Sequence, residues 1–235
     1  MRKLVVVAAW TALCSSLAQS PTEREVYRQL STKGDESVVA LEEVLQRSEN
    51  LSAVVLYSAA GVALRVARVE DAGFLFYVAR IRAQFDKHLF PPTGTGGNSP
   101  MVLFGALDHQ YGSAINPALM AQPKDFANAL ARVKSWQPRV PADYNPGWDY
   151  TAKGGEKEAL AAIQAGREQF LEGMNGMATL LQDPDYFAAF KAVQDYNLKR
   201  GTERPSQESF QAAMQTMQRI EEAKGIKGIA SKSKR

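Results

Sequence analysis

The stretch AVVLYSAAGVALRVARVEDAGFLFYVARIRAQFDKHLF, residues 53–90, decides the fold, because it is the longest apolar-rich block after the N-terminal segment. Its apolar residues recur at three- and four-residue steps, which is the period of a helix that buries one face. One stripe in its second half consists of Phe74, Val78, Ile81 and Phe85, and neighbouring apolar residues widen it. An arc that broad is typical of a helix between layers, so we expect a buried helical hairpin here.

Large and small residues alternate in this block at a spacing known from a repeat family. The positions that carry the spacing are Leu56, Ala60, Ala72, Phe76 and Ala79. Over residues 53–84 the chain resembles one helical hairpin of the tetratricopeptide and Sel1-like repeats, and the resemblance implies two antiparallel helices. It covers a single unit, since no second copy follows after about 34–38 residues. Gln84 stands near the place of the family's terminal proline. Any helical hairpin also needs small residues where its helices cross.

Length and composition indicate one all-α domain. The chain has 235 residues, of which 45% are hydrophobic and 23% charged, a composition that supports a sizeable core and argues against disorder. We expect a multi-helix domain of packed helical hairpins with two long irregular loops over residues 19–225. Residues 226–235 are rich in lysine, glycine and serine, and we expect them to be a basic disordered tail.

The first residues have the layout of a secretory signal. Arg2 and Lys3 precede the apolar run 4–13, which is too short to span a bilayer, and small and polar residues follow. We expect cleavage after Ala18, hence a signal peptide over residues 1–18 and a periplasmic or secreted protein. The alternative is a lipoprotein signal that uses Cys14.

Cleavage would leave a nearly neutral chain without cysteine. It removes two of the 28 basic residues and leaves 26 against 25 acidic ones, which gives little reason to expect nucleic acid as a partner. Cys14 is the only cysteine, so disulfides and thiol chemistry are not expected. His88 and His109 are too far apart for a recognisable metal motif, and no cofactor or metal is expected. No transmembrane segment is expected in the mature chain.

The first irregular stretch covers residues 91–111. It begins with prolines and glycines that lack the Lys-Ser or Lys-Thr pair of a P-loop, so we interpret that part as a connector. It ends with hydrogen-bonding side chains, and the binding candidates among them are Asp108, His109 and Tyr111. Asn116 and Pro117 are expected to begin another helix.

The second irregular stretch covers residues 138–155. Aromatic residues alternate there with acidic and amide side chains, and the binding candidates are Tyr144, Trp148, Asp149 and Tyr150. Flat rings beside polar tips are typical of a groove for carbohydrate or peptide. The same aromatic residues also suit a structural role, in which they anchor a long loop to the domain.

Residues 160–181 predict a long helix with a coiled-coil-like seam. The seam positions alternate steps of three and four and are Leu160, Ile163, Arg167, Phe170, Met174, Met177 and Leu181. Beside them lie Gly166, Gly173 and Gly176, each of which lowers helix stability by about 0.5–1 kcal/mol relative to alanine. Two interpretations stay open: another helix approaches closely at these glycines, or the helix breaks near residues 173–176.

These features favour a non-enzymatic protein that binds another macromolecule, with protein as the expected partner. An inhibitor or immunity protein of the bacterial envelope is a specific version of this hypothesis. The alternative is a peptidoglycan- or saccharide-processing hydrolase that uses carboxylates at 143–150, chiefly Asp143 and Asp149, since two carboxylates about 5–10 Å apart are sufficient in principle. A third hypothesis is an assembly factor held together by the seam at 160–181.

Overall fold

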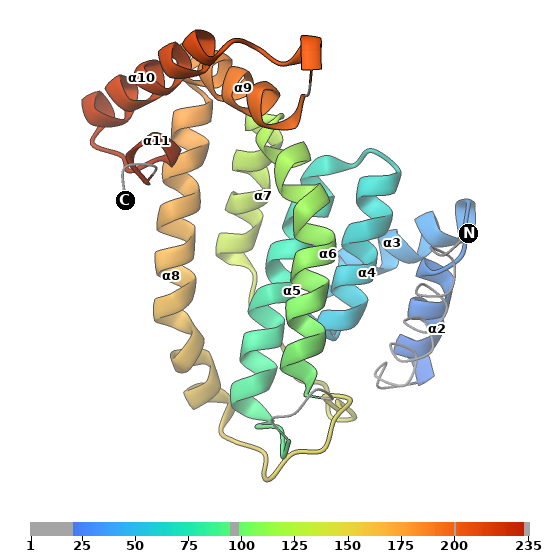
Figure 1. Cartoon of the computed structure of the whole chain (residues 1–235). Helices are drawn as coiled ribbons and strands as arrows, with labels where there is room; N and C mark the ends of the chain where they lie inside the picture. Colours follow the sequence, from blue (N-terminus) through green and yellow to red (C-terminus); the bar gives the residue numbers. More distant parts are fainter. Residues whose placement is uncertain (1–20, 95–98, 200, 233–235) are drawn as a thin grey trace.

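Ten α-helices are present in the residues that the structure, a computed structural model, describes, namely 21–94, 99–199 and 201–232. The predicted all-α fold is confirmed. At its centre lies α5 (Val69–Leu89), which contacts α4 (Ala53–Arg65), α6 (Pro100–Met120), α7 (Pro123–Ser135) and α8 (Glu156–Leu181), as Figure 1 shows. Leu75, Phe76, Tyr77 and Val78 are all buried, although four successive helical residues point to different sides. Over these residues α5 is buried on every side, whereas Arg80, Gln84, Lys87 and His88 farther along it are exposed.

The predicted hairpin at residues 53–90 is confirmed as the pair α4 and α5. The turn between them is a Schellman-type helix end, in which Arg68 N donates to Ala63 O at 2.9 Å and Ala67 N donates to Leu64 O at 3.1 Å. Ala67 has a φ of 60°, the left-handed conformation that this helix end requires. Two further helices, α2 (Pro21–Leu30) and α3 (Asp35–Arg47), pack on the outer side of α4. The short 3₁₀ helix η1 (Ser48–Asn50) connects α3 to α4.

The fold departs from the sequence prediction along α6. The helix runs without a break from Pro100 to Met120, so the first irregular stretch ends at residue 99 and no new helix begins at Asn116. Pro117 lies inside the helix, where it lacks the N–H that would bond to the carbonyl of Ser113 and where its ring crowds that carbonyl. Continuation of the helix buries Ile115 and Leu119 completely, which offsets that loss.

The helix α8 runs without a break, which excludes one of the two open interpretations, a helix break near residues 173–176. Close packing applies to Gly176 alone, where an added Cβ would lie 3.0 Å from Ile226 Cγ2. A Cβ at Gly166 or Gly173 would meet nothing within 4 Å. The seam packs within the molecule, since Ile163 and Leu181 are buried and the helix contacts α5, α7 and α9.

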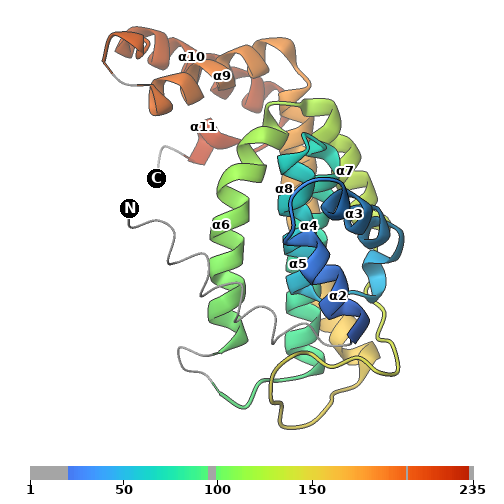
Figure 2. The same cartoon turned by 90° about the vertical axis from the view of Figure 1, so that its right-hand side faces the viewer.

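The C-terminal helices form a separate layer that lies across one end of α8, as Figures 1 and 2 show. They are α9 (Pro184–Leu198), η2 (Gly201–Glu203), α10 (Gln207–Lys224) and α11 (Ile229–Lys232). Asp183 caps α9 and Ser206 caps α10, and α10 ends at the left-handed Gly225. The structure differs from the expected disordered tail over residues 226–232, because α11 packs on α10. Residues 1–18 and 233–235 lie outside the described residues.

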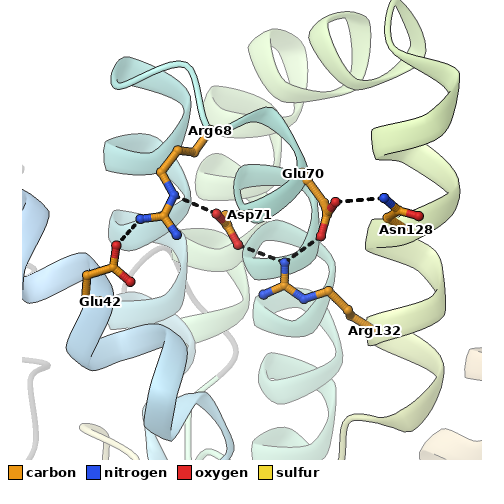
Figure 3. A network of polar contacts seen from close by, with 6 residues as sticks. All are labelled: Glu42, Arg68, Glu70, Asp71, Asn128 and Arg132. Carbon is orange, nitrogen blue, oxygen red and sulfur yellow. Dashed lines mark hydrogen bonds and ion pairs between the residues drawn. The ribbon is translucent and has the colours of Figure 1, made fainter.

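A network of charged side chains joins α3, α5 and α7 at the hairpin end, as Figure 3 shows. Arg68 bonds to Glu42 of α3 and donates to Asp71 at 2.7 Å. From α7, Arg132 donates to Asp71 at 2.8 Å and to Glu70 at 3.0 Å. Each arginine therefore lies between two carboxylates, a network that fixes the register of three helices rather than forming an open site.

Candidate functional site

A cavity of about 550 Å³ lies between α5, α6 and α8, and we call it the groove. Figure 1 shows α5 between the other two helices. The floor follows one side of α5 at three- and four-residue steps, through Tyr77, Arg80, Ile81, Gln84, Lys87 and His88. Met101, Phe104, Gly105 and Asp108 line it from α6; Ala162, Ile163, Gly166, Arg167 and Phe170 line it from α8. Most wall residues are thus apolar, apart from Asp108 on α6 and Arg167 on α8, and part of the floor is polar.

Three helices meet at the Arg80 end of the groove through a polar contact. Arg80 Nε donates to Asp108 Oδ2 at 3.1 Å, and the Tyr57 hydroxyl also donates to Asp108. The guanidinium of Arg80 lies 5.9 Å from the ring centroid of Phe76 and 5.8 Å from that of Phe170. Burial raises the pKa of Tyr57, so its hydroxyl stays protonated and keeps Asp108 in place.

Basic side chains dominate the charge of the groove. Arg167 donates to the carbonyl oxygens of Val133 and Lys134 at 3.0 and 2.5 Å, and burial lowers its pKa. Lys87 and His88 are exposed at the other end of the floor, and neither forms an ion pair with any described carboxylate. Asp108 is the one acidic residue in the lining, against three full positive charges and a histidine. The groove therefore suits an apolar ligand that carries negative charge.

Two glycines widen the groove from opposite walls. Gly105 on α6 and Gly166 on α8 both line it, and a Cβ added at either position would meet nothing within 4 Å. The walls consequently carry no side chain at these two points. A Cβ fits at both positions without a clash, so both are suitable for substitutions designed to block the groove.

The sequence candidates on α6 are not brought together as one site. Asp108 lines the groove, whereas the neighbouring His109 is exposed and does not. Tyr111 stacks on Tyr57 with ring centroids 6.1 Å apart, and its ring lies against Gly61 of α4. Tyr111 thus takes part in the contact of α6 with α4.

The second irregular stretch is held against the end of the bundle and against residues 89–93. Thr93 N donates to Asp149 O at 3.0 Å, and Gly154 N donates to Leu89 O at 2.7 Å. The indole of Trp148 donates to Phe90 O at 2.8 Å, and the ring of Tyr150 lies 5.1 Å from that of Phe90. The structure thus brings the two sequence-predicted loops together, with their aromatic residues in anchoring contacts.

Tyr144 anchors the same stretch through a buried ion pair. Arg82 and Asp86 are at most 1% exposed, and the Arg82 Nε lies 2.9 Å from Asp86 Oδ1. The Tyr144 hydroxyl donates to Asp86 at 2.5 Å, while Arg82 also donates to the carbonyl oxygens of Glu49 and Arg139. Burial raises the pKa of Asp86. In the sequence, Arg82 and Asp86 stand four residues apart within an apolar arc, and this spacing of opposite charges was the signal for a buried ion pair.

The carboxylates of the hydrolase hypothesis lie apart from the groove. Asp143 is exposed and lines a second cavity of about 480 Å³, formed by residues of α2, by Arg47 and by residues 139–144. Asp149 is exposed and lines neither of the two cavities. Its backbone carbonyl, rather than its carboxylate, makes the contact with Thr93.

Sequence reasoning missed most of the groove. Lys87, Phe104 and Arg80 drew no attention, while Ile163 and Phe170 were noted only as seam positions. The missing information is the lateral placement of three helices that are separated along the chain. The exposed glycine Gly166 beside an apolar seam was the available signal.

Comparison of the chain with protein-family models, with curated proteins and with solved structures finds no match. Over the described part of the chain, no helix combines the length and the apolar character that a membrane crossing needs. The same part of the chain contains no cluster of three or more histidine, cysteine, aspartate or glutamate side chains placed to hold a metal ion.

Proposed function

We propose that this protein works by binding a segment of another protein in the groove between α5, α6 and α8. The observation that carries the proposal is the groove itself, an amphipathic cavity of about 550 Å³ whose apolar walls surround basic side chains. Binding pockets of 300–1,000 Å³ with mostly apolar linings and a few polar groups are typical ligand sites.

The groove is supported by contacts on all sides, so it needs little rearrangement before binding. Arg80 and Asp108 link α5 to α6, and Arg167 links α8 to the end of α7. Ile163 and Tyr77 are buried beneath it. A preformed site loses less conformational entropy on binding, which favours affinity.

The expected cellular setting is the periplasm or the outside of the cell, on the strength of the signal-like residues 1–18. An inhibitor or immunity protein of the envelope is the specific form of the proposal, since both classes act by occupying a partner's surface. The two carboxylates of the hydrolase alternative do not line a common cavity, because Asp143 lines the second cavity and Asp149 lines neither.

The test blocks the groove and compares it with a matched change elsewhere on α8. Gly166→Leu places a side chain in the groove, and Gly173→Leu places the same side chain at another open position of the same helix. Both changes replace glycine by a better helix former, so both variants are expected to fold. The measurement is retrieval of a stoichiometric partner from a cell-envelope extract by each purified protein.

We expect wild-type protein and the Gly173→Leu variant to retrieve the same partner, and the Gly166→Leu variant to retrieve at least tenfold less. Circular dichroism checks that all three are folded. Equal retrieval by both variants would place the binding surface elsewhere on the molecule.

A further inference from the structure

The proposed function leaves the shape and charge of the partner open, and the inference here rests on that function. We infer that the partner inserts an amphipathic α-helix whose apolar face is flanked by carboxylates.

The walls of the groove favour a helical occupant. All three lining elements are α-helices, whose backbone N–H and C=O groups bond within each helix. An extended segment would find no strand edge to pair with and would leave its own backbone groups unsatisfied. A helix satisfies its backbone internally and needs from the groove only side-chain contacts.

The length of the groove fits about three helical turns. Its floor extends from Tyr77 to His88 along α5, which is about 16 Å at a rise of 1.5 Å per residue. A partner helix of about 11–12 residues spans this distance. Neither wall carries a side chain at Gly105 or Gly166, partway along the groove. These openings leave room for the backbone of a partner helix, which a thin ligand such as an acyl chain would not need.

The charge of the groove favours acidic side chains at the edges of that helix. Asp108 is already held by Arg80 and Tyr57, so it leaves no free carboxylate in the lining. Lys87 and His88 form no ion pair with a described carboxylate and stand at one end of the floor. Ile81 and Phe104 supply apolar contacts between the two ends. A glutamate of the partner helix placed near Lys87 would therefore form an ion pair without breaking an existing one.

Two synthetic peptides of about 14 residues test the inference with the full-length chain. Both carry the same leucines at helical spacing, and one carries glutamates on the flanking positions where the other carries lysines. Fluorescence anisotropy gives the dissociation constants for wild type, for Lys87→Glu and for Lys124→Glu. Lys124 is an exposed lysine at the start of α7, outside the groove, and serves as the matched control.

We expect the acidic peptide to bind at least tenfold more tightly than the basic one, with affinity that falls as salt rises. Lys87→Glu should weaken the acidic peptide about tenfold, and Lys124→Glu should leave it unchanged within about twofold. Equal binding of the two peptides, or binding of neither, overturns the inference. So does dodecanoate, a single-chain carboxylate, if it binds more tightly than the acidic peptide and is lost in Gly166→Leu.

The two levels of the proposal fail separately. If Gly166→Leu loses the captured partner while the two peptides bind equally, the groove remains the binding site and the acidic helix is wrong. If Gly166→Leu keeps the captured partner, the proposed function itself is wrong, whatever the peptides do.

Discussion

Three buried or half-buried glycines determine how closely α6 approaches the α4–α5 hairpin. A Cβ on Gly61 would lie 2.5 Å from the ring of Tyr111, and one on Gly112 would lie 2.8 Å from the ring of Phe76. At Gly73 the nearest atom would be Leu119 Cδ2, at 2.6 Å. Carbon atoms do not come this close, so a larger residue at any of these glycines requires the facing side chain to shift.

Gly73→Ala should destabilise the protein, whereas Gly173→Ala should stabilise it. Leu119 is fully buried and has no room to yield, so the added methyl group overpacks the core at a cost of about 1–3 kcal/mol. At Gly173 the methyl group meets nothing within 4 Å, and better helix propensity contributes about 0.5–1 kcal/mol. Chemical denaturation of both variants measures whether the free energy of unfolding falls or rises relative to wild type. Equal stability of the variants would refute this account of the α5–α6 contact.

The sequence pointed to only one of the closely packed glycines. It drew attention to Gly166, Gly173 and Gly176 because they lie beside a regular seam, and of these only Gly176 is closely packed. Helical spacing shows on which side of a helix a glycine lies, but not which residue faces it. The contacts of Gly73 and Gly112 join residues 73 to 119 and 112 to 76, which no local pattern reveals.

A single carboxylate, that of Glu221, holds the last helical element in place. It accepts hydrogen bonds from Ala230 N at 3.0 Å, from Ser231 N at 2.9 Å and from the Tyr186 hydroxyl at 2.9 Å. Burial alone would raise the pKa of Glu221, but the hydrogen bonds from Ser231, Ala230 and Tyr186 outweigh it and lower the pKa below its usual value. The charged form of Glu221 therefore stabilises the docking of α11.

Glu221→Gln should destabilise the protein at neutral pH and much less in acid. An amide retains only part of these contacts, and hydrogen bonds to a charged group contribute about 1.5–3 kcal/mol each, so we expect a loss of about 1–3 kcal/mol at pH 6. Because the folded pKa is lowered, this contribution is complete above the usual pKa of glutamate and is lost as the pH falls through the folded pKa. Denaturation at pH 6 and at pH 3 measures the difference between variant and wild type.

Glu222→Gln is the matched control for that experiment. Glu222 is exposed on the same helix, so its substitution should change stability by less than about 0.5 kcal/mol at either pH. A Glu221→Gln effect that is the same at pH 6 and pH 3 would show that the carboxylate charge does not hold α11.

Most helices could be predicted from the sequence. Their first residues could be predicted only where a capping side chain was present. Asp183 before Pro184 and Ser206 before α10 mark true starts, because their side chains accept backbone hydrogen bonds. Pro117 misled the prediction, since proline is most readily accommodated in the first turn of a helix, yet here it lies inside one and removes a helical hydrogen bond. The burial of Leu119 against α5 favours continuation of the helix, and that burial is a tertiary effect.

At the scale of the whole molecule, the groove exists because α6 and α8 both pack on α5 and leave one side of it uncovered between them. Of the seven binding candidates from the sequence, Asp108 alone lines this groove. The loop aromatics Tyr144, Trp148 and Tyr150 contact the bundle instead. The lining residues come from separate helices and are spread along the chain between residues 57 and 170. Such a site depends on how the helices are placed relative to one another, and the periodicity within each helix does not predict that placement.

NMR chemical-shift mapping of the protein with its captured partner tests directly whether the partner occupies this groove. We expect the largest changes within residues 77–88, 101–108 and 162–170, the three ranges that contain most of the groove lining. Largest changes on residues 138–155, or on α9 and α10, with the groove unaffected, would contradict it.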